Sequence, residues 1–98
     1  MEMTVDGKPV RANAFVQKIV TNITWSVVDS LDDVPENPQS VSITFAGESP
    51  IKLTVDGQDI RMNPFVQKVS RNIIAGLIRS LDGVPENPQN ISISSSKR

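Results

Sequence analysis

Few side chains of this 98-residue chain could carry out acid–base, nucleophilic or metal chemistry. The sequence contains no histidine, no cysteine and no tyrosine, so the usual general base near neutral pH, the thiolate nucleophile and the common zinc ligands are missing. Ser26 and Ser30 stand four residues apart, but a serine becomes a nucleophile only beside a base. We therefore predict no catalytic residue, no cofactor and no metal ligand set, and we expect that the protein is not an enzyme.

Carboxylates are the main remaining candidates for a site. Asp29, Asp32, Asp33 and Glu36 lie close together in the sequence, and their oxygens could hold a hard cation. Their spacing matches no calcium-binding loop, and an acidic stretch of turn-forming residues is ordinarily solvated. A solvated loop is the preferred interpretation, and cation binding near Asp32 stays open.

Charge is distributed unevenly along the chain. Residues 1–49 carry three basic and seven acidic side chains and residues 50–98 carry seven and four, so the two halves have net charges of −4 and +3. Lys68, Arg71 and Arg79 are expected on one face of a helix, where they could contact phosphates. Because the sequence pI is about 5.2 and no tyrosine is available for stacking, we predict at most weak nucleic-acid binding.

Trp25 is the only tryptophan in the chain. At helical spacing, its neighbours include Thr21 and Asp29. A large aromatic side chain among polar residues is typical of an interface anchor. We expect Trp25, Thr21 and Asp29 to form an exposed surface for another protein or for a second copy of this chain. The alternative is that Trp25 packs over the helix edge or against the other half.

The elements that would position these residues follow from an internal repeat. Shifted by fifty residues, residues 4–45 align with 54–95 without a gap, and 23 of the 42 aligned positions are identical. The segment VPENPQ, for example, occurs twice. We call residues 3–45 the first repeat, 53–95 the second repeat and 46–52 the connector. Two units are too few for a solenoid and indicate a pseudo-dimer.

Each repeat predicts a hairpin, a helix and a strand. An Asp-Gly pair between two short extended runs, as at Asp56 and Gly57, favours a two-residue hairpin turn. Asn63 followed by Pro64 is typical of a helix start. Proline-rich loops then end the helices and lead into a last strand. The expected ranges are 14–31 and 64–81 for the helices, and 41–45 and 91–94 for the last strands.

Both predicted helices are amphipathic. At about 100° per residue, the apolar residues of each helix fall on one arc, and we expect that arc to face the sheet. The arcs consist of Phe15, Val16, Ile19, Val20, Ile23, Val27 and Leu31 in the first helix and of Phe65, Val66, Val69, Ile73, Leu77 and Leu81 in the second. Ser26 with Ser30, and Gly76 with Ser80, are expected to allow close approach to a neighbour.

The predicted fold class is α+β, with two ββαβ units forming a pseudo-dimer. A right-handed crossover would place each third strand beside the first strand of its own repeat, so that six strands form an antiparallel, or partly mixed, sheet under two helices. The short connector also allows a hairpin between the repeats, so exchange of third strands stays open. Either half alone would bury too little surface to be stable, and residues 1–98 are therefore expected to form a single domain.

Composition is that of a folded globular chain, with 38% hydrophobic and 21% charged residues. No apolar run approaches the ~18 residues of a membrane span, and the first residues show no secretory pattern. With no cysteine to indicate an oxidising compartment, we expect no membrane association and a cytoplasmic location.

One further pattern combines a DG turn, N-x-FV, N-I, G-L, SL and a glycine that ends the helix. The second repeat matches its last part at Gly76, Leu77, Ser80, Leu81 and Gly83, whereas the first repeat departs from it at Ser26, Val27 and Asp33. The pattern resembles short uncharacterised archaeal proteins that carry one such unit. The resemblance implies that single-unit relatives dimerise and that this chain fuses two protomers, and no activity comes with it. We therefore expect a non-enzymatic binding or assembly module, with nucleic-acid binding as the alternative.

Overall fold

In the described part of the chain, the fold consists of six strands and two helices. The computed structural model describes residues 1–47, 49–85 and 87–96; Glu48 of the connector, Glu86 of the second proline-rich loop and residues 97–98 lie outside the described residues. Hairpin, helix and strand follow one another in each repeat. The elements are β1 (Glu2–Val5), β2 (Lys8–Pro9), α1 (Ala14–Asp29), β3 (Ser40–Ala46), β4 (Lys52–Val55), β5 (Gln58–Ile60), α2 (Pro64–Arg79) and β6 (Asn90–Ser96).

Local sequence signals account for the turns and the helix starts. Asp6 and Asp56 have φ angles of 52° and 51°, and each precedes a glycine that also has positive φ, as a two-residue hairpin turn requires. The side-chain oxygens of Asn13 and Asn63 accept hydrogen bonds from the third residue of the helix, at 2.9 and 2.8 Å. Both helices end two residues before the predicted position.

The sheet is antiparallel throughout, in the order β2-β1-β6-β3-β4-β5. The third strand of each repeat pairs with the first strand of the other repeat: β6 with β1, and β3 with β4. The expectation that β3 lies beside β1 is therefore wrong, and the exchanged arrangement that the connector allows is present. The order reads the same from either edge when the repeats are interchanged.

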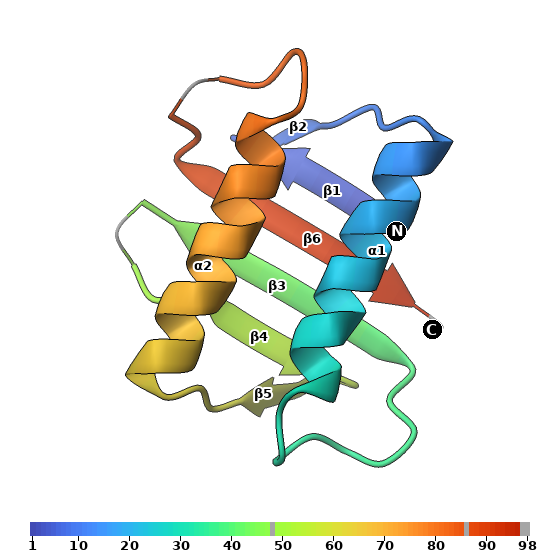
Figure 1. Cartoon of the computed structure of the whole chain (residues 1–98), viewed down its shortest axis with the longest axis vertical. Helices are drawn as coiled ribbons and strands as arrows, with labels where there is room; N and C mark the ends of the chain where they lie inside the picture. The colour runs from blue at the N-terminus through green and yellow to red at the C-terminus, as the bar shows by residue number, and fades with distance from the viewer. Residues whose placement is uncertain (48, 86, 97–98) are drawn as a thin grey trace.

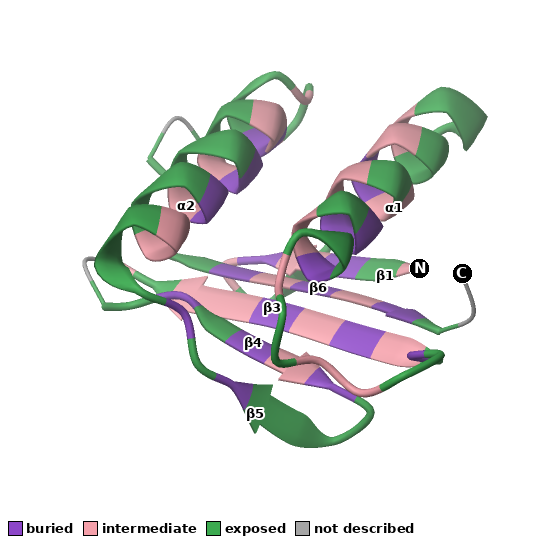
Figure 2. Ribbon diagram, turned by 60° about the horizontal axis from the view of Figure 1, so that its bottom comes forward, coloured by how far each residue is buried: buried purple, intermediate pink, exposed green. Residues whose placement is uncertain are grey.

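The molecule has two layers, with both helices on one face of the sheet (Figure 1). The helices lie side by side and run in opposite directions, and the strands pass beneath them (Figures 1 and 2). Alternate strand residues such as Ile43, Leu53 and Ile93 are buried under the helices. The core contains residues of both repeats, so neither repeat holds a complete core by itself.

The helices are rotated relative to the prediction. The fully buried positions of α1 include Val20, Thr24 and Val28, and those of α2 include Ile74 and Ile78. The predicted arcs are therefore only partly correct, because their outer members point away from the sheet. Phe15 and Phe65 are 71% and 73% exposed.

The prediction that small residues allow close approach of a helix to its neighbour is also wrong. Ser26, Ser30 and Ser80 are exposed, and a Cβ atom added at Gly76 would meet no atom within 4 Å. The hydroxyl groups of Ser30 and Ser80 instead donate to carbonyl oxygens one turn earlier, at 2.8 and 2.9 Å.

Candidate functional site: a groove between the helices

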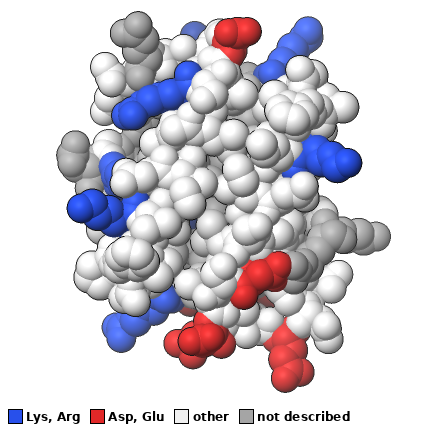
Figure 3. All heavy atoms as spheres, viewed as in Figure 1, with Lys and Arg blue, Asp and Glu red and all other residues white. Residues whose placement is uncertain are grey.

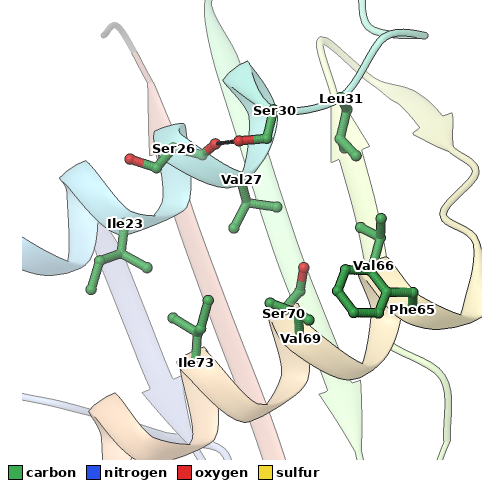
Figure 4. Close-up of a pocket in the computed structure, with 10 residues that line it drawn as sticks. All are labelled: Ile23, Ser26, Val27, Ser30, Leu31, Phe65, Val66, Val69, Ser70 and Ile73. Carbon is green, nitrogen blue, oxygen red and sulfur yellow. Dashed lines mark hydrogen bonds between the residues drawn. The ribbon is translucent and has the colours of Figure 1, made fainter.

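A groove of about 440 Å³ lies between the two helices. Figure 4 shows Ile23 and Val27 of α1 pointing towards α2, and Val66 and Ile73 of α2 pointing towards α1. Ser70, on the α2 wall, is buried, whereas the serines on the α1 wall are exposed. The lining residues are Ile23, Ser26, Val27, Ser30 and Leu31 of α1 and Phe65, Val66, Val69, Ser70 and Ile73 of α2.

Apolar side chains remain exposed on the helices, in the groove and outside it, because two helices that both lie flat on the sheet cannot cover each other's outer sides. Among the described residues, the large hydrophobic side chains that remain exposed are Phe15, Phe65, Val69 (38%) and Ile73 (42%), and all four belong to the helices. Seen from the helix side, the centre of the surface is free of charge, and the charged groups lie around it (Figure 3). We call this surface the helix face: Phe15, Ile19, Ile23 and Val27 of α1 together with Phe65, Val69, Ile73 and Leu77 of α2.

Trp25 does not belong to the exposed surface. Its side chain is 4% exposed and belongs to the core, and its Nε1–H donates to the hydroxyl oxygen of Ser95 at 3.3 Å. The expectation of an exposed anchor is wrong, because α1 lies near the end of β6, where residue 95 is a serine small enough to leave room for the indole. Of the two residues predicted to flank Trp25 on this surface, Thr21 is half-buried and Asp29 is exposed.

The three cations predicted for α2 do not have equivalent environments. Lys68 and Arg79 are exposed, whereas Arg71 is half-buried and its guanidinium lies 5.1 Å from the centre of the Phe45 ring. Arg71 also donates to the carbonyl oxygen of Ser49. These contacts use one N–H group and one face of the guanidinium, and they restrict its movement towards a phosphate.

The acidic residues near Asp32 follow the end of α1 and are solvent-exposed at positions 32, 33 and 36. In the part of the chain that the structure describes, no three acidic side chains are grouped so that they could hold a metal ion.

Two of the segments that are identical in both repeats, TVDG and VPENPQ, are joined to each other across the repeats by hydrogen bonds. One carboxylate oxygen of Asp56 accepts from the backbone N–H groups of Gln39 and Ser40, both at 2.9 Å. Asp6 does the same with Gln89 and Asn90, both at 2.8 Å. We call these two arrangements the aspartate clamps. The sequence of one repeat alone does not reveal these clamps. The occurrence of both segments in both repeats is a signal that could have indicated a contact between them.

The clamp at Asp56 has an electrostatic consequence. The hydrogen bonds from the backbone of Gln39 and Ser40, in that order of importance, lower the pKa of the Asp56 carboxyl, and desolvation opposes them only in part. Hydrogen bonds to an ionised carboxylate favour its charged form. This clamp is therefore an interaction of the ionised aspartate.

None of the helices that the structure describes is long and apolar enough to cross a membrane. Comparison with protein-family models, curated proteins and solved structures finds no match to this chain. Function is therefore inferred from the geometry of the helix face itself.

Proposed function

We propose that this protein is a non-enzymatic binding or assembly module that uses its helix face to bind another protein surface. The observation that carries the proposal is the exposure of large apolar side chains on the two helices, with Phe15 and Phe65 at 71% and 73%, and the position of Phe65, Val69 and Ile73 along one groove. Contiguous apolar patches with polar surroundings mark interaction sites on soluble proteins. Aromatic side chains in such a patch are the residues that most often dominate binding energy.

We also propose that the chain is a fused pseudo-dimer. Its support is the alignment of residues 4–45 with 54–95 together with a strand order that is unchanged when the repeats are interchanged. In this interpretation the two phenylalanines are equivalent residues of two protomers, and fusion fixes both on one face.

Nucleic-acid binding is the weaker proposal. Of the three cations on α2, Arg71 already contacts Phe45 and Ser49. Acidic residues also gather at one end of the helix side, below the end of α1 (Figure 3). A phosphate backbone would meet repulsion at that end.

Site-specific photo-crosslinking in the source cells tests the binding function. A benzophenone amino acid placed at Phe65 reports on the helix face, and the same probe at Ser42 reports on the opposite, bare face of the sheet. We expect a protein cross-linked from position 65 and not from position 42, and we expect Val69→Asp to abolish that product. Equal products at both positions, or none at position 65, would contradict the proposal.

A further inference from the structure

We propose that Asp82 and Gly83, in the loop that follows α2, form a site of spontaneous covalent modification at which the aspartate is converted to isoaspartate. The chain contains three Asp-Gly pairs, at positions 6–7, 56–57 and 82–83. In the folded chain the third pair has an environment that differs from that of the other two. This inference is independent of the binding function of the helix face.

The reaction needs only these two residues and water. The backbone nitrogen of Gly83 attacks the side-chain carboxyl carbon of Asp82 in its neutral acid form, and the carboxyl hydroxyl leaves with the N–H proton as water. Water then opens the resulting succinimide ring by breaking one of its two C–N bonds. One opening restores aspartate, and the other leaves isoaspartate, in which the main chain passes through the former side-chain carboxyl. Glycine favours the attack because it has no Cβ and a flexible backbone.

The carboxylates of the two hairpin pairs are held by the aspartate clamps. One oxygen of Asp6 accepts hydrogen bonds from two backbone N–H groups at 2.8 Å, and one oxygen of Asp56 accepts from two at 2.9 Å. Each carboxylate must leave these bonds before its carbon can reach the nitrogen of the following glycine. The hydrogen bonds from Gln39 and Ser40 also lower the pKa of Asp56, so less of its neutral acid form is present. Both hairpin pairs are therefore protected in the folded chain.

The Asp82 side chain has no such constraint. Asp82 is exposed, and its carboxylate forms no hydrogen bond or ion pair with another described residue. The backbone N–H of Gly83 donates to no group in the described part of the chain. A Cβ atom added at Gly83 would meet no atom within 4 Å, so no neighbouring group hinders the approach of the two reacting atoms.

The loop also has room for the product. Isoaspartate adds one CH₂ group to the main chain between α2 and β6. Residues 82–85 border a hollow of about 710 Å³, which they share with the β1–β2 hairpin (Figure 1). The longer main chain can therefore be accommodated by a local movement of the loop, and β6 can stay paired with β1 and β3.

Peptide mapping of the intact chain after ageing tests the proposal. The folded chain is kept at neutral pH and well below its Tm, and a parallel sample is kept unfolded in urea. Digestion after lysine and arginine places the three Asp-Gly pairs on three different peptides, and fragmentation by electron transfer distinguishes isoaspartate from aspartate. The unfolded sample is the internal standard, because it lacks the clamps and keeps all three sequences.

We expect isoaspartate at position 82 of the folded chain. Its formation at positions 6 and 56 should be at least about tenfold slower, since one hydrogen bond to a charged group changes an equilibrium by roughly that factor. In urea the three positions should react at similar rates. Equal rates at all three positions of the folded chain would overturn the inference, as would a folded chain in which position 82 reacts as slowly as the other two.

The variant Asp82→Glu supplies an independent test. Glutamate keeps the charge but would have to close a larger ring, which forms much more slowly, and the exposed position should leave Tm unchanged. Asp33→Glu, in the corresponding loop of the first repeat, is the matched control, because Asp33 is followed by valine. Methyl transfer from a purified isoaspartyl methyltransferase to the aged, folded protein should fall to the level of fresh protein in Asp82→Glu and stay unchanged in Asp33→Glu. Methylation that persists in Asp82→Glu would contradict the assignment.

Discussion

At the scale of single residues, the aspartates of the hairpin turns have two functions. The hairpin turn requires a positive φ at Asp56, and aspartate is among the few residues with a Cβ that tolerate this backbone conformation. The same position directs the carboxylate at the backbone N–H groups of Gln39 and Ser40. The VPENPQ segment is repeated, in our interpretation, because its last residue and the residue after it present two N–H groups to an aspartate of the other repeat.

The Asp56 clamp predicts a dependence of stability on pH. Because the pKa of Asp56 is lowered by folding, its contribution is complete above the ordinary carboxyl pKa and is lost as the pH falls through the lowered value. Asp56→Asn should therefore lower Tm at neutral pH, and the difference from wild type should shrink in acid. Asp33→Asn, at an exposed loop position, is the control for charge. Thermal unfolding monitored by circular dichroism measures both, and a Tm difference that does not change with pH would contradict the assignment.

At the scale of elements, the sequence predicts the helices and strands well but not the side of each helix that faces the sheet. Asn13, Asn63 and the Asp-Gly turns are local signals that act within four residues, so their structural effect is visible in the sequence. The apolar arc of each helix covers both the side that contacts the sheet and the side that borders the groove, and periodicity cannot separate the two. The pattern therefore predicts that Phe15 and Phe65 face the sheet, and it does not indicate the groove.

The position of Trp25 depends on a partner that is distant in the sequence. Trp25 of α1 lies on Ser95 of β6, and the equivalent residues in the repeat alignment are Ala75 of α2 and Phe45 of β3. The first pair thus combines a large helix residue with a small strand residue, and the second pair combines a small helix residue with a large strand residue. Arg71, one turn before Ala75, lies over Phe45 and fills further space there. No local pattern reveals this exchange of sizes, because the paired residues are seventy positions apart for Trp25 and Ser95.

This exchange of sizes predicts a rescue. Trp25→Ala should cost about 3–5 kcal/mol, as is usual when a buried tryptophan is removed, and Ser95→Phe alone should cost about 1–3 kcal/mol through overpacking. The double variant should be more stable than Trp25→Ala, because it copies the Ala75 and Phe45 combination. Urea unfolding of the four proteins gives the coupling energy. Trp25→Ala combined with Ser42→Phe is the control. If the losses of unfolding free energy caused by Trp25→Ala and Ser95→Phe simply add in the double variant, the two residues do not share one space.

At the scale of the whole molecule, strand exchange makes each repeat incomplete. Among the described residues of the first half, β1 and β2 are the only strands that pair with each other, since β3 pairs with β4 and β6 and the second neighbour of β1 is also β6. The sequence predicts that neither half is stable alone, from its small size. It leaves the strand exchange open, because the connector length is compatible with both arrangements.

The last prediction concerns the two halves as separate chains. Residues 1–49 alone, and residues 50–98 alone, should be unfolded or self-associated, and mixing them should restore a folded complex of one copy of each. A homodimer of the first half would place Trp25 against Phe45, and a homodimer of the second would leave Ala75 facing Ser95 across a cavity. The mixed complex avoids both faults, and the opposite net charges of the halves, −4 and +3, favour it further.

Native mass spectrometry of the mixture should therefore show the mixed complex in excess over a statistical distribution, and circular dichroism should show a cooperative transition absent from either half. Trp25→Ala in the first half is the matched test of the size argument, since it should reduce that preference. A monomeric half that melts cooperatively by itself would show that one repeat is complete, contrary to the strand pairing.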